Sequence, residues 1–287
     1  MTGSERLPVL RTAKLFIGGA FPRSESGRSY EVVSADGRPL AFAAQASRKD
    51  LRDAVAAARA AQPGWAGATA ANKGQILYRV AELMEGRRAQ FEAELTDAGA
   101  ADPARGVAAA IDRWVWYAGW ADKIAQVRGS SNPVAGPYFN FTVPEPTGVV
   151  GIMAPQDQAL LGLVGRIAPA IVSGNTAVVI ASRRSPLPAV SLGEVLATSD
   201  VPGGVVNILT GFPAELAPWL AGHMDVNAID VTGVPPDQVG EIEELAAENV
   251  KRVVRAPEAD PFSSEAQSPY QVTALTEFKT VWHPIGA

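Results

Sequence analysis

The side chains that most often form chemical centres are scarce in this sequence. The chain of 287 residues contains no cysteine and two histidines, His223 and His283. Without cysteine it can form no disulfide and no thiolate metal site, and it supplies no cysteine nucleophile. Two histidines this far apart in sequence do not form a multi-histidine metal site. We therefore predict no metal centre, and we expect each histidine to have a surface or capping role.

Two other clusters resemble sites, but we interpret both as structural. Glu241, Glu244 and Glu248 recur at helical spacing opposite Ile242 and Leu245, which indicates a solvated stripe on an amphipathic helix. Aromatic residues at helical spacing within 103–127 are more typical of packing than of a cofactor cage. This second cluster consists of Trp114, Trp116, Tyr117 and Trp120.

Composition narrows the class of protein. Hydrophobic residues make up 47% of the chain and charged residues 19%, as in ordinary globular proteins. The net charge is −5 and no basic block is present, so nucleic acid is not an expected partner. No apolar run reaches the ~18 residues of a membrane helix, and the first residues contain no apolar signal core. We expect a cytoplasmic protein with no membrane partner.

The elements that must position any site follow a βα alternation. Short β-branched runs are predicted as strands at 149–153, 177–180, 205–209, 228–231 and 250–254. Helices are predicted between them, at 158–172, 187–198, 213–222 and 237–248. This pattern predicts an α/β fold with a Rossmann-like, parallel, doubly wound sheet of about five strands joined by right-handed crossovers.

The flanking segments predict a second, smaller layer and several helices. Strands are expected at 14–21, 30–33 and 40–45 as a small antiparallel layer, and Ser47 with Asp50 resembles a capping box. Helices are then expected at 47–61, 70–85, 88–96 and 103–127. Pro63-Gly64 is expected to end the first of them.

Two apolar strands are predicted outside the main sheet. The first lies within 138–143 and the second within about 272–283, after a Pro-, Ser- and acid-rich linker at 256–271. An apolar strand outside a core aggregates unless a partner covers it. The interface residues that we predict are Tyr138, Phe139, Phe141, Val143, Phe278, Val281 and Trp282.

Six segments, in order, resemble the aldehyde dehydrogenase superfamily. They read K-L-F-I-G-G (14–19), V-A-A-A-R-A-A-Q-P-G-W (55–65), Y-A-G-W-A-D-K-I (117–124), E-P-T-G-V-V-G (145–151), I-A-P-A-I-V-S-G-N-T (167–176) and L-T-E-F-K-T-V-W (275–282). In that family a catalytic domain with the nucleophilic cysteine lies between the fifth core strand and the last flap strand. Here the linker occupies that interval, so the chain is similar to a truncated dehydrogenase. It is also similar to the cysteine-less second module of the two-module aldehyde dehydrogenases.

The resemblance divides the chain into five parts. These are the N-terminal hairpin and helices of the dinucleotide-binding domain (1–128), an oligomerisation flap strand (129–146), a Rossmann-like core (147–255), a linker in place of the catalytic domain (256–271) and a C-terminal flap strand (272–287).

The catalytic positions that the resemblance identifies have changed. The family's P-W-N-F segment, with its oxyanion-binding asparagine, here begins at Pro155 and places Asp157 at the asparagine. A carboxylate has the wrong charge for an oxyanion site, and we interpret Asp157 as an N-cap for the next helix. Ala256 stands where the family has its general base. We therefore expect that the chain is a pseudoenzyme, not an enzyme on its own.

The cofactor positions have also changed. The family's K-P-S-E segment, which holds the adenosine ribose, is here Ile180, Ala181, Ser182 and Arg183. The family's glycine turn retains Gly233, but the prolines that follow lack backbone N–H donors. We regard these positions as vestigial and expect no cofactor, with NAD or NADP as the alternative.

Loss of the catalytic domain leaves apolar surface that predicts a partner. We expect a hetero-oligomer in which the flap docks to a full-length aldehyde dehydrogenase subunit, which the chain stabilises or regulates. The alternative is an NAD(P)-binding auxiliary subunit that contributes to a shared oxidoreductase active site.

Overall fold

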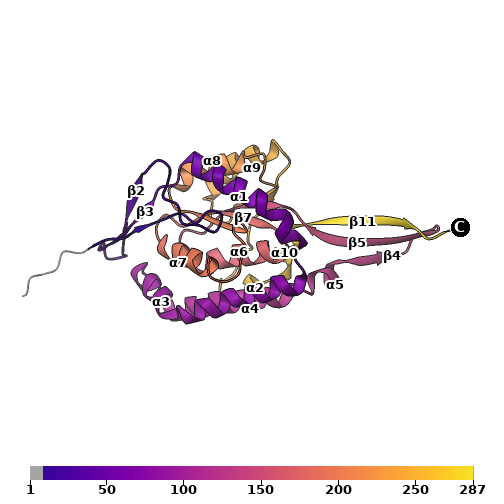
Figure 1. The fold of residues 1–287 in the computed structure, drawn as a ribbon, viewed down its shortest axis with the longest axis horizontal. Coiled ribbons are helices and arrows are strands. Elements are labelled where there is room, and N and C mark those ends of the chain that lie inside the picture. Colours follow the sequence, from indigo (N-terminus) through magenta and orange to yellow (C-terminus); the bar gives the residue numbers. More distant parts are fainter. Residues whose placement is uncertain (1–8, 287) are drawn as a thin grey trace, which may run out of the picture.

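A five-stranded parallel sheet forms the centre of the computed structural model, which describes residues 9–286. The strand order is β10-β9-β6-β7-β8 (Figure 1). The strands are β6 (Val149–Met153), β7 (Thr176–Ile180), β8 (Val206–Leu209), β9 (Ala228–Asp230) and β10 (Arg252–Val254). The predicted fold class is confirmed, and all five strands lie within two residues of their expected bounds.

Alternate residues of each strand enter opposite halves of the core. In β6, Val150 and Ile152 pack in one hydrophobic cluster, whereas Val149 and Met153 pack in the other. Every residue of β6 is buried. A strand covered on both faces needs apolar residues at every position, which is why these strands read as continuous β-branched runs.

Helices cover both faces of the sheet (Figure 1). On one face lie α1 (Arg48–Gly67), α8 (Pro213–Ala221) and α9 (Val239–Ala247), the last preceded by the short η1 (Pro236–Gln238). The other face is covered by α6 (Leu161–Val172) and α7 (Leu187–Leu196), and behind them by α2 (Ala70–Gly86), α3 (Arg88–Asp97) and α4 (Pro103–Trp120). Trp114 and Tyr117 of α4 are fully buried, in agreement with a packing role.

The amino-terminal layer differs from the predicted antiparallel arrangement. It contains β1 (Thr12–Ala13), β2 (Ser29–Val33) and β3 (Pro39–Ala44), and β1 pairs with β3 in parallel. Only β2 and β3 form an antiparallel pair. The predicted strand at 14–21 is wrong: Phe16 instead makes a single bridge to Ile208 of the central sheet.

Two helix predictions are corrected by tertiary contacts. Helix α1 continues through Pro63 to Gly67, because Trp65 is buried and its indole donates a hydrogen bond to the Ile171 carbonyl at 2.8 Å. The predicted helix at 103–127 is two helices, α4 and α5 (Ile124–Arg128), separated by a turn in which the Ala121 amide bonds to the Ala118 carbonyl.

The flap projects from the body as a narrow antiparallel sheet (Figure 1). Its strands are β4 (Ser130–Asn132), β5 (Tyr138–Pro146) and β11 (Thr276–Pro284), in the order β11-β5-β4. The expected irregular linker contains η2 (Ser264–Ala266) and the start of α10 (Pro269–Thr273), so the last strand begins later than predicted. Residues 1–8 of the first predicted part and residue 287 of the last lie outside the described residues.

Within residues 9–286, no helix combines the length and the apolar character needed to cross a membrane. The same residues contain no group of three or more His, Asp or Glu side chains arranged to hold a metal ion.

Candidate functional site

The sheet topology places a cleft where the strand order reverses. Strands β7 and β8 lie on one side of β6, and β9 and β10 lie on the other. Open α/β sheets bind ligands outside the carboxyl ends of the strands at such a switch point. Here a cleft of about 330 Å³ lies beyond β6, β7 and β9, lined by residues that include Met153, Gln156, Ile180, Gly233 and Glu241.

Ile180 and Gly233 are the predicted cofactor positions that line this cleft together. Gly233 passes so close to β6 that an added Cβ would collide with the Ala154 carbonyl, so the turn requires glycine. The next turn does not resemble an open anion site: Pro235 precedes η1, and Pro236 is its first residue. Both prolines lack the N–H groups that would otherwise point at a phosphate.

Ser182 and Arg183 follow β7 but do not line the cleft. The buried Ser182 hydroxyl donates to the Gln156 carbonyl at 2.9 Å and accepts from the Ser185 amide. The Arg183 guanidinium lies 4.0 Å from the Phe212 ring centroid. These two side chains therefore stabilise the loop after β7 and do not contribute to the lining of the cleft.

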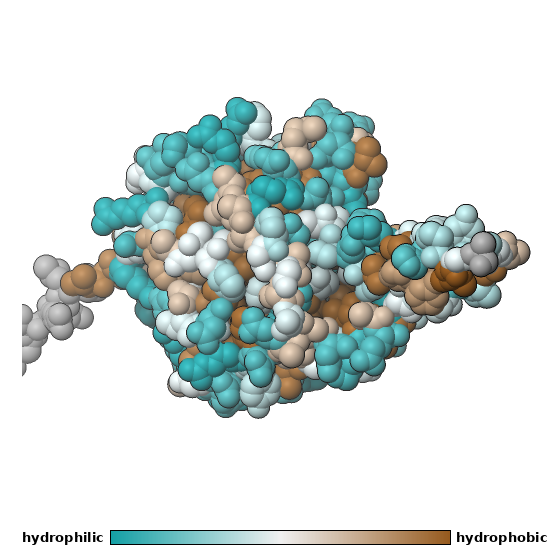
Figure 2. Space-filling model, turned by 45° about the vertical axis from the view of Figure 1, so that its right-hand side comes forward, coloured by the Kyte–Doolittle hydropathy of each residue, from teal (hydrophilic) through white to brown (hydrophobic). Residues whose placement is uncertain are grey.

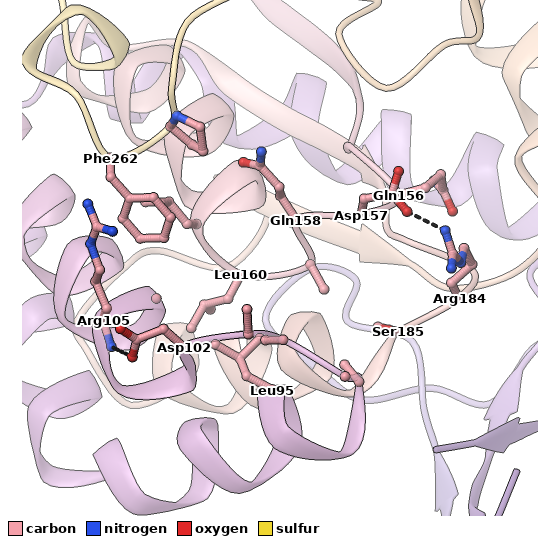
Figure 3. A pocket seen from close by; sticks show the side chains of 18 residues that line it. Leu95, Asp102, Arg105, Gln156, Asp157, Gln158, Leu160, Arg184, Ser185 and Phe262 are labelled. Carbon is pink, nitrogen blue, oxygen red and sulfur yellow. Dashed lines mark hydrogen bonds and ion pairs between the residues drawn. The ribbon is translucent and has the colours of Figure 1, made fainter. Parts of the chain in front are cut away.

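Asp157 belongs to a different pocket, of about 460 Å³, between the α3–α4 connection and the loop before α6 (Figure 3). The interpretation of Asp157 as an N-cap is wrong. Helix α6 begins at Leu161 after Leu160, and it has no side-chain cap. Asp157 instead forms an exposed ion pair with Arg184, a contact between loops 27 residues apart that local sequence does not reveal.

Pro155 lines a third cavity, of about 260 Å³, together with Ala256 and the linker. The structure thus separates the predicted positions: Ile180 and Gly233 share the cleft, Asp157 lies in the pocket of Figure 3, and Pro155 lies under the linker.

The two histidines lie apart. His223 is half-buried after α8, and its Nδ1 accepts a hydrogen bond from the Asp225 amide at 3.2 Å. Burial lowers its pKa, with Lys251 adding to the shift and Asp225 opposing it. His283 is exposed on β11, opposite Phe139.

The predicted interface residues all lie on β5 and β11, but on both faces of the flap. Register pairs Val281 with Phe141 and His283 with Phe139 on one face, and Trp282 with Asn140 on the other. By alternation, one face carries Phe139, Phe141, Val143 and Val281, and the other carries Tyr138, Phe278 and Trp282. The projecting arm is accordingly rich in apolar surface in Figure 2.

Sequence reasoning missed a buried ion pair between Arg166 of α6 and Asp230 of β9. The closest oxygen and nitrogen are 3.3 Å apart, and both side chains are buried. Thr232 donates its amide to the other Asp230 oxygen at 2.9 Å. A signal was present: each charge interrupts an otherwise apolar run, and buried charges require partners.

Comparison with known proteins assigns the chain to a family. The profile of the "Aldehyde dehydrogenase family" matches residues 21–256. Retinal dehydrogenase 2 of Gallus gallus is 36% identical over 258 residues, covering 85% of this chain and 48% of the relative. 2-Hydroxymuconic semialdehyde dehydrogenase of Pseudomonas sp. (strain CF600) is 37% identical over 235 residues, covering 78% and 48%. The chain therefore belongs to the aldehyde dehydrogenase family, and it spans about half the length of these relatives.

Solved structures agree with this assignment. The NAD+ complex of the aldehyde dehydrogenase from Bacillus cereus superposes with a TM-score of 0.78 at 28% identity, covering 85% of this chain and 50% of that one. HpcC from Thermus thermophilus gives a TM-score of 0.80 at 29% identity, covering 86% and 48%. The resemblance to a truncated dehydrogenase is confirmed.

The same findings contradict the expectation that the chain is not an enzyme on its own. The relatives that it matches are dehydrogenases, and the match covers most of this chain. Loss of individual family side chains does not establish the absence of activity, because a truncated dehydrogenase can still be part of an enzyme.

Proposed function

We propose that this chain is a subunit of an aldehyde dehydrogenase assembly, which docks by its flap to a full-length family member and stabilises or regulates it. The observation that carries the proposal is the flap, both of whose faces carry exposed aromatic side chains. The chain contains no cysteine. If the assembly oxidises an aldehyde through a thiol, that thiol therefore comes from the full-length subunit.

Exposure of the flap supports a docking role. A solvated antiparallel sheet commonly buries one face and keeps the other polar. Here Phe139 is 48% exposed on one face, while Phe278 and Trp282 are 46% and 58% exposed on the other. Phe139 stacks near Phe141 and Tyr138 near Trp282, but neither contact covers the sheet. A partner that covers both faces would remove this apolar area from water.

The outer edge of β11 supports the mode of docking. This strand lies at the edge of the flap and is nine residues long. Such an edge offers unpaired backbone groups to another strand. An added strand from a partner would pair with the free backbone N–H and C=O groups of β11 and would cover the apolar side chains beside them. A family member with its own flap could supply such a strand.

Co-expression with full-length aldehyde dehydrogenases of the same organism tests the proposal. We expect one of them to co-purify with this chain as a species of defined mass in native mass spectrometry. The double variant Phe139→Glu, Trp282→Glu should abolish the complex, because it places a carboxylate at an exposed aromatic position on each face without setting two like charges opposite each other in the strand register. The matched control is Met224→Glu, at an exposed apolar residue outside the flap, which should still form the complex.

Two results would count against this function. One is a chain that stays monomeric in the presence of every full-length candidate. The other is a complex that survives the double variant unchanged, since docking would then use another surface.

The second candidate function is NAD(P) binding in the cleft at the switch point, as an auxiliary subunit of a shared active site. The position of the cleft and the requirement for glycine at Gly233 favour it. The apolar Ile180 and the two prolines of the turn oppose it, so we expect no stable cofactor. Calorimetric titration with NAD and NADP decides the question, and micromolar affinity for either would establish this second candidate.

A further inference from the structure

The linker covers a cavity that neither candidate function uses. The cavity has a volume of about 260 Å³ and lies between α4, α6 and residues 256–266 of the linker. A neighbouring cavity of about 440 Å³ shares Arg166, Pro257 and Gln271 with it. Typical sites for drug-sized ligands measure about 300–1,000 Å³. The smaller cavity therefore suits a ligand of only a few heavy atoms.

The charge lining this cavity is positive. Its ionisable lining residues are Arg113 and Arg166, and both are buried. Asp230 neutralises Arg166 through one carboxylate oxygen, while Thr232 donates to the other oxygen. Among residues 9–286, Arg113 has carbonyl partners but no carboxylate partner: its guanidinium donates to Ala266 at 2.7 Å and to Pro261 at 2.9 Å. One positive charge therefore remains unbalanced beneath the linker.

Several buried polar atoms in or near the cavity lining have no hydrogen-bond partner among the described residues. They are Nε of Arg113 and Oε1 of Gln271, which belong to lining residues, and the hydroxyl of Tyr117, which does not line the cavity but lies near both arginines. The orientation of the Gln271 side-chain amide is fixed by its nitrogen, since Nε2 donates a hydrogen bond to the Ala266 carbonyl at 2.9 Å. Buried polar groups in proteins are normally satisfied. This set needs an acceptor for Arg113 and a donor for Gln271.

Burial makes the unbalanced charge costly. It lowers the pKa of Arg113; Tyr117 opposes this shift, and the positive charge of Arg166 adds to it. Burial also raises the pKa of Tyr117 to about 12, against the opposing effect of the two arginines. Tyr117 therefore stays neutral and supplies no compensating charge. An anion that enters the cavity would provide it.

We propose that the cavity beneath the linker binds a small anion that also carries a hydroxyl group. The anionic oxygens accept from the Arg113 and Arg166 guanidinium groups, and the hydroxyl donates to Oε1 of Gln271. Two ligand classes share this chemistry: a short 2-hydroxycarboxylate and inorganic phosphate, which keeps a hydroxyl near neutral pH. Guanidinium groups bind both kinds of oxyanion through paired hydrogen bonds.

Isothermal titration calorimetry of the full chain with glycolate and, separately, with inorganic phosphate tests the proposal. We expect saturable binding of at least one probe. Acetate has the same carboxylate as glycolate but no hydroxyl, so it should bind at least about fivefold more weakly if glycolate is the ligand class. Phosphate binding without glycolate binding assigns the site to phosphate.

Two variants locate the binding. Arg113→Met should weaken the preferred probe at least about tenfold, since it removes charged hydrogen bonds. Gln271→Leu retains both arginines and should weaken it at least about fivefold, which provides a second test if the arginine variant does not fold. The matched control is Arg79→Met. Arg79 is an exposed arginine of α2 that pairs with Glu82 and lies outside the cavity lining, so binding should not change.

Hydrogen exchange supplies an independent readout. The bound anion should slow amide exchange within 257–266, because this segment covers the cavity and contributes the carbonyls that hold Arg113. Absence of saturable binding for both probes would overturn the proposal. So would binding that Arg113→Met and Gln271→Leu leave unchanged.

Discussion

The strands of the central sheet and of the flap are both rich in apolar residues, but their surroundings are opposite. Strand β6 reads V-V-G-I-M and is buried at every position, whereas β5 reads Y-F-N-F-T-V-P-E-P and is mostly accessible. Helices cover both faces of the central sheet, and none covers the outer part of the flap (Figure 1). Hydrophobicity therefore indicates that a strand needs cover, but not whether its own chain provides it.

The same contrast holds for ion pairs. Arg166 and Asp230 are buried in the body, whereas Lys279 and Glu145 form an exposed pair across the flap strands at 3.2 Å. In the core, an unpaired charge is costly because water does not solvate it. In the flap, the pair is screened by solvent and contributes little.

Removal of a buried charge should give the largest difference between the two regions. Asp230→Ala leaves Arg166 uncompensated in the core, and we expect a loss of about 3–5 kcal/mol in the free energy of unfolding. Lys279→Ala is the matched flap variant and should change it by no more than about 1 kcal/mol. Urea unfolding followed by circular dichroism measures both. Equal losses of unfolding free energy for Asp230→Ala and Lys279→Ala would contradict the proposed difference between the core and the flap.

Truncation of apolar side chains should show the next largest contrast. Leu163 of α6 is 1% exposed, so Leu163→Ala should cost about 2–5 kcal/mol through lost burial and the cavity that remains. Val281→Ala in the flap should cost less than about 1 kcal/mol. Thermal and urea unfolding of the isolated chain distinguish them. A larger loss for the flap variant would show that the flap is part of the cooperative core.

The first helix cap should have a smaller effect. The Ser47 hydroxyl accepts from the Asp50 amide, and the Asp50 carboxylate accepts from the Ser47 amide at 2.8 Å. Ser47→Ala should destabilise the chain by about 1 kcal/mol, as expected for an N-cap. Chemical unfolding tests this value. Ser130→Ala, at an exposed serine of the flap, is the control and should leave stability within about 0.5 kcal/mol of the parent.

The pH dependence of His223 should give the smallest effect. Burial depresses the pKa of the folded state below the ordinary value of 6.5. The unfolded chain therefore binds more protons between the two pKa values, and stability falls as the pH decreases from 6.5 through the folded pKa. Unfolding curves from about pH 7.5 to 5 should show a smaller decrease for His223→Asn. An unchanged pH profile would contradict this assignment.

The candidate site is only partly predictable from sequence, because its residues meet through long-range contacts. Motifs identify Ile180 and Gly233, and these two residues do share a cleft. The pattern around Asp157 predicts a helix cap, yet its partner Arg184 lies on another loop. Arg113 carries no functional signal in the sequence, since its importance depends on the linker carbonyls and on Arg166 nearby. Sequence spacing within one helix does not contain that information.

By itself, the sequence determined the strands of the central sheet, the order of the elements and the Ser47 capping box, because local patterning and capping depend on neighbouring residues. Tertiary structure alone decided that α1 passes Pro63, where the buried Trp65 compensates for the proline. It also decided that the linker folds over two arginines and that the flap projects with both faces exposed. These features depend on which distant segments pack against each other. The free energy gained when apolar surface is buried between them is a property of the folded molecule and cannot be assigned to any one segment.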